Sequence, residues 1–273
     1  MPILVLLAGG AVVGAFGSLL GLGGGLLLVP LLTFGFDVPI GEAVGISLVC
    51  VIMTSSASAA VYLERRVANL RLGVTLELAT ASGAMGGAMI AFAVPERGLA
   101  GLFALTLVYV AVSMVRRRAE DRPSIYVPDG PTVADEPKPF PASVLNGPGY
   151  RARRLGLGLV GSAFAGVVSA LLGVGGGIVK VPLMNVAMGV PLRVATGTSN
   201  MMIGVTAAAG AIVYLARGGI DPVVAAPTAI GVFAGASVAS RVSGRIDARI
   251  LRVLFVIVTL YTAVLMAIRA AGL

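Results

Sequence analysis

The stretch GSLLGLGGGLLLVPLL, residues 17–32, has a close copy in SALLGVGGGIVKVPLM, residues 169–184. The two stretches lie 152 residues apart, and the same shift aligns the flanking segments without a gap over most of each half. Each stretch places consecutive glycines inside an otherwise apolar run. Self-similarity at a fixed spacing over such a length indicates an internal duplication, so we expect two copies of one structural unit.

The composition indicates the class of protein. Of the 273 residues, 58% are hydrophobic and 12% are charged, and the mean hydropathy is +1.01. Soluble domains have about 25% charged residues, so this chain has too little polar surface and is predicted to be a polytopic membrane protein. The net charge of +8 comes largely from arginines in the gaps between apolar runs. That distribution follows the positive-inside rule and does not favour nucleic acid as a partner.

The scarcity of reactive side chains argues against an enzyme or a metal protein. The chain has one cysteine, Cys50, and no histidine. One cysteine forms neither an internal disulfide nor a thiolate metal site, and histidine is the commonest metal ligand and general base. We therefore expect no catalytic residues, no metal and no cofactor. The N-terminus lacks the positive region of a signal peptide and belongs to the repeat, so we expect it to be retained.

Each half contains five apolar runs, and a polar segment joins the halves. The runs are 2–20, 24–35, 40–63, 71–94 and 97–115 in the first half, and 154–172, 176–190, 192–216, 222–242 and 249–271 in the second. The segment between them is rich in proline and charge, which is typical of a solvated linker. We expect a first transmembrane repeat over 1–115, a linker over 116–153 and a second repeat over 154–273.

The glycines interrupt a helix inside the membrane. The run 24–35 covers about 18 Å as a helix, whereas the hydrocarbon core of a bilayer is about 30 Å thick. The first two runs of each half therefore form either a re-entrant hairpin of partial helices or a broken pair that crosses together. Backbone at that depth must be buried in protein or face a wet cavity.

The positive charges distinguish two topologies. If each broken pair counts as two crossings, the halves have opposite orientations, and if it counts as one, they are parallel. The inverted arrangement leaves only Arg97, Arg217 and Arg269 on the outer side, apart from the intramembrane Lys180, and this is the stronger bias. We therefore expect an all-α polytopic membrane protein of two inverted-topology repeats with about five helical segments each. Its linker is predicted to be cytoplasmic and both termini outside.

Two helix starts in the membrane offer a site for an anion. The first N–H groups of a helix lack partners, and the helix dipole adds partial positive charge there. Glycine lets a ligand approach the backbone closely, and helix starts of this kind bind anions. We expect the two starts to approach one another about a pseudo-two-fold axis. The candidate substrate-binding glycines are Gly23, Gly24, Gly25, Gly175, Gly176 and Gly177.

Charged and polar side chains extend this candidate site. Lys180 lies in an apolar run where the first half has Leu28, and it either binds the anion or reaches a nearby surface. Glu77 either carries a coupling proton or lies at the interface near Arg71.

A polar segment of the second half supplies further candidates. It contributes Thr196, Thr198, Ser199 and Asn200, whose hydroxyl and amide groups bind oxyanions or join helices, whereas the first half keeps only Ser47.

The paired motifs GLGGGLLLVPLL and GVGGGIVKVPLM, each followed by a VP…A.G.S pattern, resemble the sulfite exporter TauE/SafE family, also called the toluene sulfonate uptake permease family. The resemblance covers almost the whole chain apart from the linker. It implies an inner-membrane carrier for sulfite, sulfonates or related sulfur anions. It also supports a substrate role for the glycines, for Ser47 and for residues 197–200.

Together these features predict a secondary transporter that moves a small sulfur-containing anion across the inner membrane by alternating access. Its expected partners are the small anion and the lipid bilayer, with self-association left open. The alternatives are an anion channel of the same architecture and a carrier for a carboxylate or another non-sulfur oxyanion. The exact substrate, the direction of transport and the coupling ion also stay open.

Overall fold

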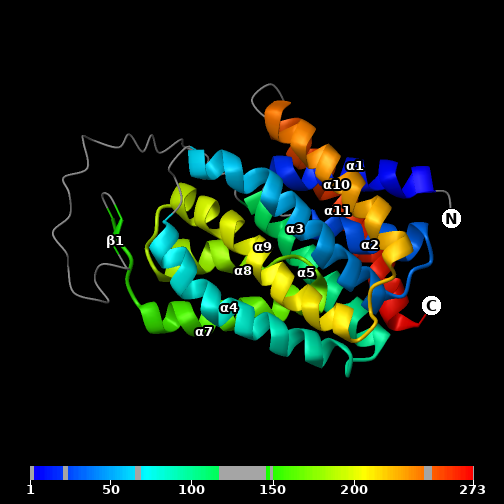
Figure 1. The fold of residues 1–273 in the computed structure, drawn as a ribbon, viewed down its shortest axis with the longest axis horizontal. Helices are drawn as coiled ribbons and strands as arrows, with labels where there is room; N and C mark the ends of the chain where they lie inside the picture. The colour runs from blue at the N-terminus through cyan, green and yellow to red at the C-terminus, as the bar shows by residue number, and fades with distance from the viewer. Residues whose placement is uncertain are drawn as a thin grey trace.

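The computed structural model describes residues 3–20, 24–64, 69–116, 146–147, 150–242 and 248–272. Most of the predicted linker, residues 117–145 and 148–149, lies outside these ranges. Next to it, β1 (Asn146–Gly147) and β2 (Tyr150–Arg151) form a short antiparallel pair. The rest of the described chain is built from helices and their connections (Figure 1).

The helix boundaries repeat between the two halves. The first half contains α1 (Ile3–Leu20), α2 (Gly25–Gly35), α3 (Ile40–Glu64), α4 (Leu70–Ala91) and α5 (Glu96–Arg116). The second half contains α7 (Leu155–Leu172), α8 (Gly177–Pro182), the π-helical segment η2 (Leu183–Ala187), α9 (Leu192–Ala216), α10 (Pro222–Val242) and α11 (Ala248–Ala271). A shift of 152 residues maps α1 onto α7, α2 onto α8 with η2, and α3 onto α9, and the first and last residues of each pair coincide. The duplication in the sequence thus extends to the helix boundaries.

Seven helices in the described ranges are long and apolar enough to cross a membrane, namely α3, α4, α5, α7, α9, α10 and α11. Shorter apolar helical segments are Ile3–Leu19 of α1, Gly25–Gly35 and Gly177–Ala187. Large apolar side chains such as Leu4, Leu105 and Val160 point outward, as they do on a surface that faces lipid. The protein is therefore an all-α polytopic membrane protein, as the composition predicted.

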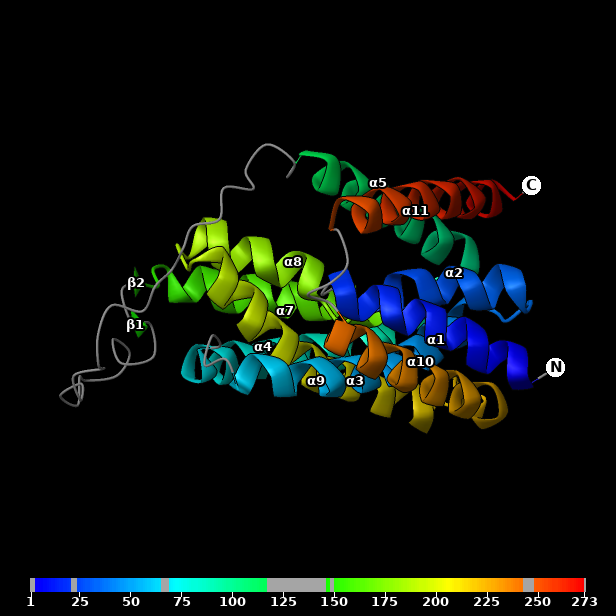
Figure 2. The ribbon, with the colours of Figure 1, turned by 90° about the horizontal axis from the view of Figure 1, so that it is seen from above.

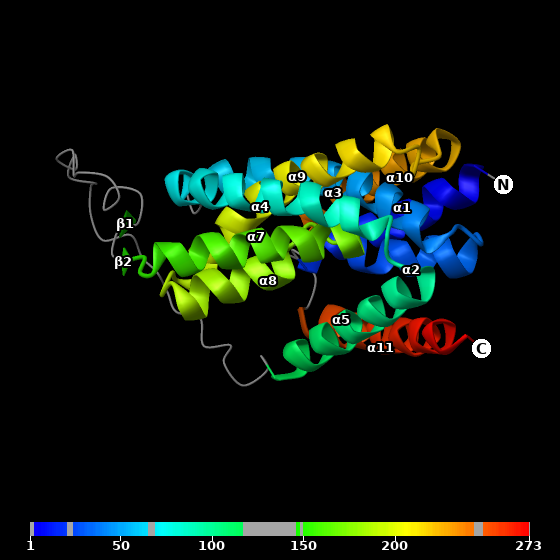
Figure 3. The ribbon, with the colours of Figure 1, turned by 90° about the horizontal axis from the view of Figure 1, so that it is seen from below.

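The helices pack in pairs that the duplication exchanges. α1 packs against α10 and α4 against α7, while α3 packs against α9 and α5 against α11. Replacing each helix by its copy turns the first pair into the second and leaves the other two unchanged, which is the pattern of a pseudo-two-fold axis. α5 and α11 lie side by side at one edge of the molecule (Figures 2 and 3).

α1 and its copy α7 run in opposite directions in the bundle (Figures 1 and 2). α1 begins at the end of the molecule that carries the N-terminus, whereas its copy α7 begins at the opposite end, beside β2 (Figures 1 and 2). α4 and α9 also begin near β1 and β2, so three helices of the bundle start at the end that carries this strand pair (Figure 2).

Glycines allow the close approach of the paired helices. A Cβ on Gly14 of α1 would overlap the backbone of Val232 in α10, and a Cβ on the equivalent Gly166 of α7 would overlap the backbone of Thr80 in α4. Since lipid tails are as apolar as the helices, packing through small residues is a main source of helix association in a membrane. The same contact in both halves gives each repeat the same frame around its glycine stretch.

Candidate functional site

The glycine stretch of the first half ends one helix and begins another. α1 ends at Leu20, and α2 begins at Gly25 after Gly24, which has a left-handed backbone with φ 73°. Gly23 lies outside the described residues. The amides of Leu27 and Leu28 donate the first hydrogen bonds of α2, both to the carbonyl of Gly24 at 3.2 and 3.3 Å.

The second half has a longer break with more glycines in unusual conformations. Between α7 and α8, Gly173, Gly175 and Gly176 have φ values of 66°, 77° and 77°. Side chains with a Cβ rarely adopt this region, which explains why the sequence places glycines here. The amides of Val179 and Lys180 donate to the carbonyl of Gly176 at 3.2 and 3.0 Å. The N–H groups of Gly177 and Ile178 precede these first intrahelical bonds.

The two breaks meet inside the bundle. Gly25 packs directly against the carbonyl of Gly173, so closely that a Cβ on Gly25 would overlap it. Ser47, fully buried on α3, lies between them, with its Oγ 2.7 Å from the Gly173 oxygen and 3.3 Å from the Gly25 oxygen. The hydroxyl donates to these carbonyls, so Ser47 joins the two breaks. At Gly25, the start of α2 thus contacts the end of α7, where the second break begins.

Unpaired hydroxyls gather at the start of α8. Ser199, the copy of Ser47, is fully buried, and its Oγ lies 3.5 Å from the position that a Cβ on Gly177 would take. Ser169 on α7 is equally buried, and its Cβ lies 3.3 Å from the corresponding position on Gly176. Neither hydroxyl has a hydrogen-bond partner within the described part of the chain. Because an unpaired buried polar group costs about 1–3 kcal/mol, these hydroxyls are groups that a bound anion would satisfy.

The other predicted polar residues of α9 have different surroundings. The hydroxyl of Thr198 accepts a hydrogen bond from the amide of Asn69 at 2.9 Å, so it joins α9 to the first turn of α4. The main-chain oxygen of Asn200 accepts from Ser55 at 2.7 Å, while its side-chain nitrogen has no partner among the described residues. Thr196 is half-buried one turn before Asn200. In this segment, the Ser199 hydroxyl lies beside a glycine break.

Lys180 forms a closed network with side chains of two other helices. Its Nζ lies 3.1 Å from Oε2 of Glu77 on α4 and 2.5 Å from Oγ1 of Thr206 on α9. The Thr206 hydroxyl donates to Oε1 of Glu77 at 2.6 Å. Each of these residues therefore contacts both others, and the network joins α4, α8 and α9.

Both charged residues of this network are buried inside the protein. Lys180 is 1% exposed and Glu77 is 8% exposed. The interpretation that Lys180 reaches a nearby surface is therefore wrong, and the Glu77 carboxylate faces the protein interior. The physical reason is that each residue has an opposite charge within hydrogen-bond distance, which offsets the cost of removing it from water. The Cε of Lys180 also lies 3.5 Å from the position of a Cβ on Gly176, so the ion pair adjoins the break.

An apolar cluster covers the ion pair on one side. Leu76 precedes Glu77, Met184 lies one turn after Lys180, and Met202 lies one turn before Thr206; all three are buried in one cluster with Leu72 and other apolar side chains. The cluster lies toward the end of the bundle where α4, α7 and α9 begin (Figure 2). The cluster therefore lies between the charged network and the end of the bundle that carries β1 and β2.

Thr206 and Ser169 were not recognised from the sequence. Thr206 follows Ser199 by two helical turns on the same face of α9, so a polar stripe along that helix was the available signal. Ser169 replaces Gly17 of the first half, a polar difference within the repeated stretch itself.

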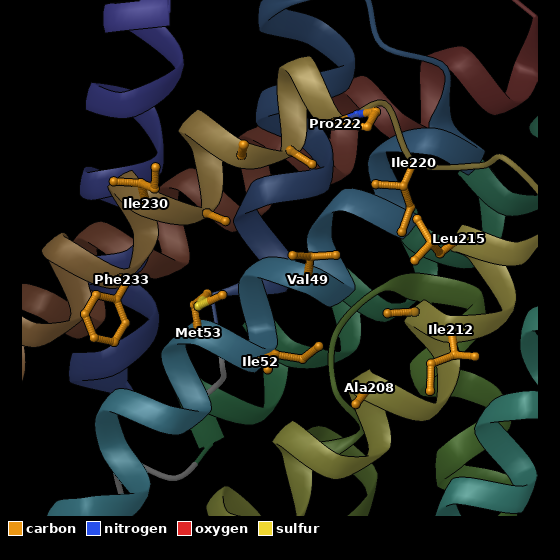
Figure 4. Close-up of a pocket in the computed structure, with 14 residues that line it drawn as sticks. Val49, Ile52, Met53, Ala208, Ile212, Leu215, Ile220, Pro222, Ile230 and Phe233 are labelled. Atoms are coloured by element: carbon orange, nitrogen blue, oxygen red, sulfur yellow. The ribbon is translucent and has the colours of Figure 1, made fainter.

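A large cavity lies elsewhere, between α3, α9 and α10. It has a volume of about 680 Å³ and includes Val49, Met53, Ile212, Ile230 and Phe233 (Figure 4). Its lining is apolar throughout and includes none of the predicted site residues. Hydrocarbon fits such a surface, whereas an anion needs donors or positive charge, so this cavity is not the anion site.

No group of three or more His, Cys, Asp or Glu side chains that could hold a metal ion occurs in the ranges that the structure describes. The polar groups of the candidate site are hydroxyls, backbone amides and one ion pair. These groups bind oxyanions by hydrogen bonds and charge.

Comparison with known proteins places this arrangement in a family. The family model described as sulfite exporter TauE/SafE matches residues 6–266. The probable membrane transporter protein YunE of Bacillus subtilis (strain 168) is 24% identical over an alignment of 272 residues. The alignment covers 94% of this chain and 96% of YunE. The probable membrane transporter protein MJ0441 of Methanocaldococcus jannaschii is 28% identical over 223 residues, covering 79% of this chain and 72% of MJ0441. No solved structure matches the chain.

Proposed function

The chain belongs to the sulfite exporter TauE/SafE family, and from that premise we propose that it carries a small sulfur-containing anion, sulfite or a sulfonate, across the inner membrane by alternating access. The coarser function, that of a membrane transporter, follows from the family and from the relatives. The finer assignment of a sulfur oxyanion as substrate rests on the chemistry at the second glycine break.

The observation that carries the proposal is the group of donors at the start of α8. The N–H groups of Gly177 and Ile178 precede the first intrahelical bond, and the buried hydroxyls of Ser169 and Ser199 have no partner in the described ranges. The positive charge of Lys180 lies one turn further along the same helix. Together they form a set of hydrogen-bond donors of the kind that a tetrahedral or pyramidal oxyanion satisfies.

In this arrangement, Gly175, Gly176 and Gly177 let the anion approach the backbone, and Ser199 binds one of its oxygens. Gly24 and Gly25 of the first half supply the opposing surface, with Ser47 holding the two breaks together. The contact between Gly25 and Gly173 closes the space between the breaks, so transport requires them to separate there. Separation and closure at this contact are the conformational step that we assign to the transport cycle.

We place the two repeats in the membrane with opposite orientations. Alternating access then follows when the halves exchange conformations about a fixed site. The positive-inside rule puts the linker in the cytoplasm and both termini outside. Single cysteines introduced at the exposed positions Arg71 and Arg241, in a Cys50→Ser protein, should both react with an impermeant reagent from the cytoplasmic side. Labelling from opposite sides would mean that the repeats are parallel.

Counterflow in proteoliposomes tests the transport function. Vesicles loaded with unlabelled sulfite should transiently accumulate external ³⁵S-labelled sulfite. A carrier that moves unlabelled sulfite outward presents its empty site outside, where the site binds labelled sulfite and carries it inward. Sulfonates should compete, and acetate should compete less. A channel of the same architecture would equilibrate the label without a transient excess, and competition by acetate alone would favour the carboxylate carrier.

A further inference from the structure

Lys180, the cation that the proposed anion would bind, already forms an ion pair with the Glu77 carboxylate. Both ends of the pair are buried, and Thr206 bridges them through its hydroxyl. The positive charge that would attract a substrate is thus already matched by a carboxylate of the protein itself. This contact distinguishes Lys180 from a free binding cation.

The helices that pack around the pair carry few other ionisable residues. α7 and η2 contain no charged residue, α8 contains only Lys180, and α4 contains Arg71 and Glu77, of which Arg71 is exposed at the first turn. On α9 the ionisable residues are Arg193 at its start and Tyr214 near its end, whose hydroxyl donates to the carbonyl of Ala170. The elements that surround the pair therefore contribute no third charge beside it among the described side chains.

Binding the substrate anion beside the neutral Lys180–Glu77 pair has a high free-energy cost. It would leave one net negative charge in a medium of low dielectric constant, and the cost of such a charge is high. If Glu77 takes up a proton, the same site holds a neutral carboxylic acid, the Lys180 cation and the bound anion, and its net charge stays zero. Thr206 can keep its hydrogen bond to the protonated carboxyl group while Lys180 turns toward the adjoining break.

We propose that the Glu77 carboxylate and the transported anion compete for Lys180, so that the protein binds its anion together with one proton, which Glu77 takes up. This inference rests on the proposed function and adds to it the coupling ion and its site. Anion and proton then move together in the same direction. For a singly charged anion the transport step carries no net charge, because an empty site with its ion pair and a loaded site with its proton are both neutral.

The Glu77→Gln variant provides the test. It keeps the size of the side chain and a carbonyl oxygen for Lys180 and Thr206, but it has no charge to compete and no proton to take up. The exposed Glu96→Gln on α5 is the matched control. The binding of sulfite and of methanesulfonate to purified protein would be measured calorimetrically at several pH values, and the ratio of the dissociation constants of wild type and variant would be taken at each pH.

This ratio removes the effect of pH on the anion itself. With one proton taken up for each anion bound, the wild-type dissociation constant should rise relative to that of Glu77→Gln by about tenfold for each pH unit, over the range where Glu77 is ionised in the empty protein. Glu96→Gln should follow the wild type. In proteoliposomes, an inward proton gradient should drive accumulation of the anion by the wild type, whereas Glu77→Gln should retain counterflow and lose this accumulation.

The outcomes separate the two proposals. If wild type and Glu77→Gln change equally with pH, or if the proton gradient still drives accumulation in the variant, the competition is refuted while the transport function stands. If neither sulfite nor methanesulfonate binds to the wild type or undergoes counterflow, the proposed function fails and this inference fails with it. Binding of both anions by a folded Glu77→Gln protein shows that loss of coupling does not come from unfolding.

Discussion

The break of the first half and the break of the second half share a backbone frame but differ in their side chains. The network beside the second break consists of Lys180 and Thr206 of the second half and Glu77 of the first. A shift of 152 residues relates these positions to Leu28, Thr54 and Ala229, and all three of those residues are buried. The charged network thus has an uncharged counterpart at the related position. Duplication supplied the frame twice, and only one copy acquired the ion pair.

The serines of the two breaks show the same division. Ser47 donates to the carbonyls of the opposing breaks, while its copy Ser199 has no hydrogen-bond partner in the described chain. One serine therefore holds the breaks together, and the other leaves a donor unused. From this comparison we propose that the first break has a structural role and that the second binds the anion.

The largest effect is expected where the halves differ most, at Lys180. Lys180→Met should destabilise the protein by about 3–5 kcal/mol, because it leaves the Glu77 carboxylate buried without its partner. It should also abolish anion binding. The measurements are thermal unfolding in detergent and calorimetric binding of sulfite.

The double variant Lys180→Met with Glu77→Gln separates these two effects. It should recover most of the stability, since no unpaired charge remains, but it should still bind no anion. Leu28→Met is the matched change in the first half and should alter both measurements little. Anion binding by the double variant would show that the two breaks do not differ in the way proposed here.

A smaller effect is expected from adding a methyl group at each helix start. Gly25→Ala would overlap the backbone carbonyl of Gly173, which cannot move without shifting the chain, whereas Gly177→Ala would meet the flexible tip of Ile203. We expect Gly25→Ala to cost about 1–3 kcal/mol, the range for overpacking, and Gly177→Ala to cost less. Thermal unfolding of both proteins, with Gly86→Ala on α4 as the control in open space, checks the order. Equal losses would mean that the two starts are equally constrained.

The smallest effect on stability is expected at the paired serines, and here the two halves should respond in opposite ways. Ser47→Ala removes a hydrogen bond to two buried carbonyls and should cost about 1 kcal/mol. Ser199→Ala removes a buried hydroxyl without a described partner, so it should maintain or raise the unfolding temperature and weaken sulfite binding. Thr259→Val, which removes another buried unpaired hydroxyl on α11, should leave sulfite binding unchanged. A Ser199→Ala protein with unchanged sulfite affinity would remove Ser199 from the site.

The sequence predicted the helical architecture well because its signals are local. An apolar run and a group of glycines determine where a helix can form and where it must stop, and the duplication repeats the same boundaries 152 residues later. It also identified Lys180, since a charge inside an apolar run needs a specific reason. It did not identify Thr206 as part of the site, because a threonine in a membrane helix usually bonds within its own helix.

By itself, then, the sequence determined that this chain is a duplicated, membrane-embedded bundle of helices with a glycine break in each half and one charge beside the second break. The tertiary structure decided what that charge contacts. Lys180 and Glu77 are 103 residues apart, and Ser47 and Gly173 are 126 residues apart. Contacts over such separations leave no periodic pattern in the chain; they exist because α4, α8 and α9 pack around one buried position, where a charge is stable only beside its opposite.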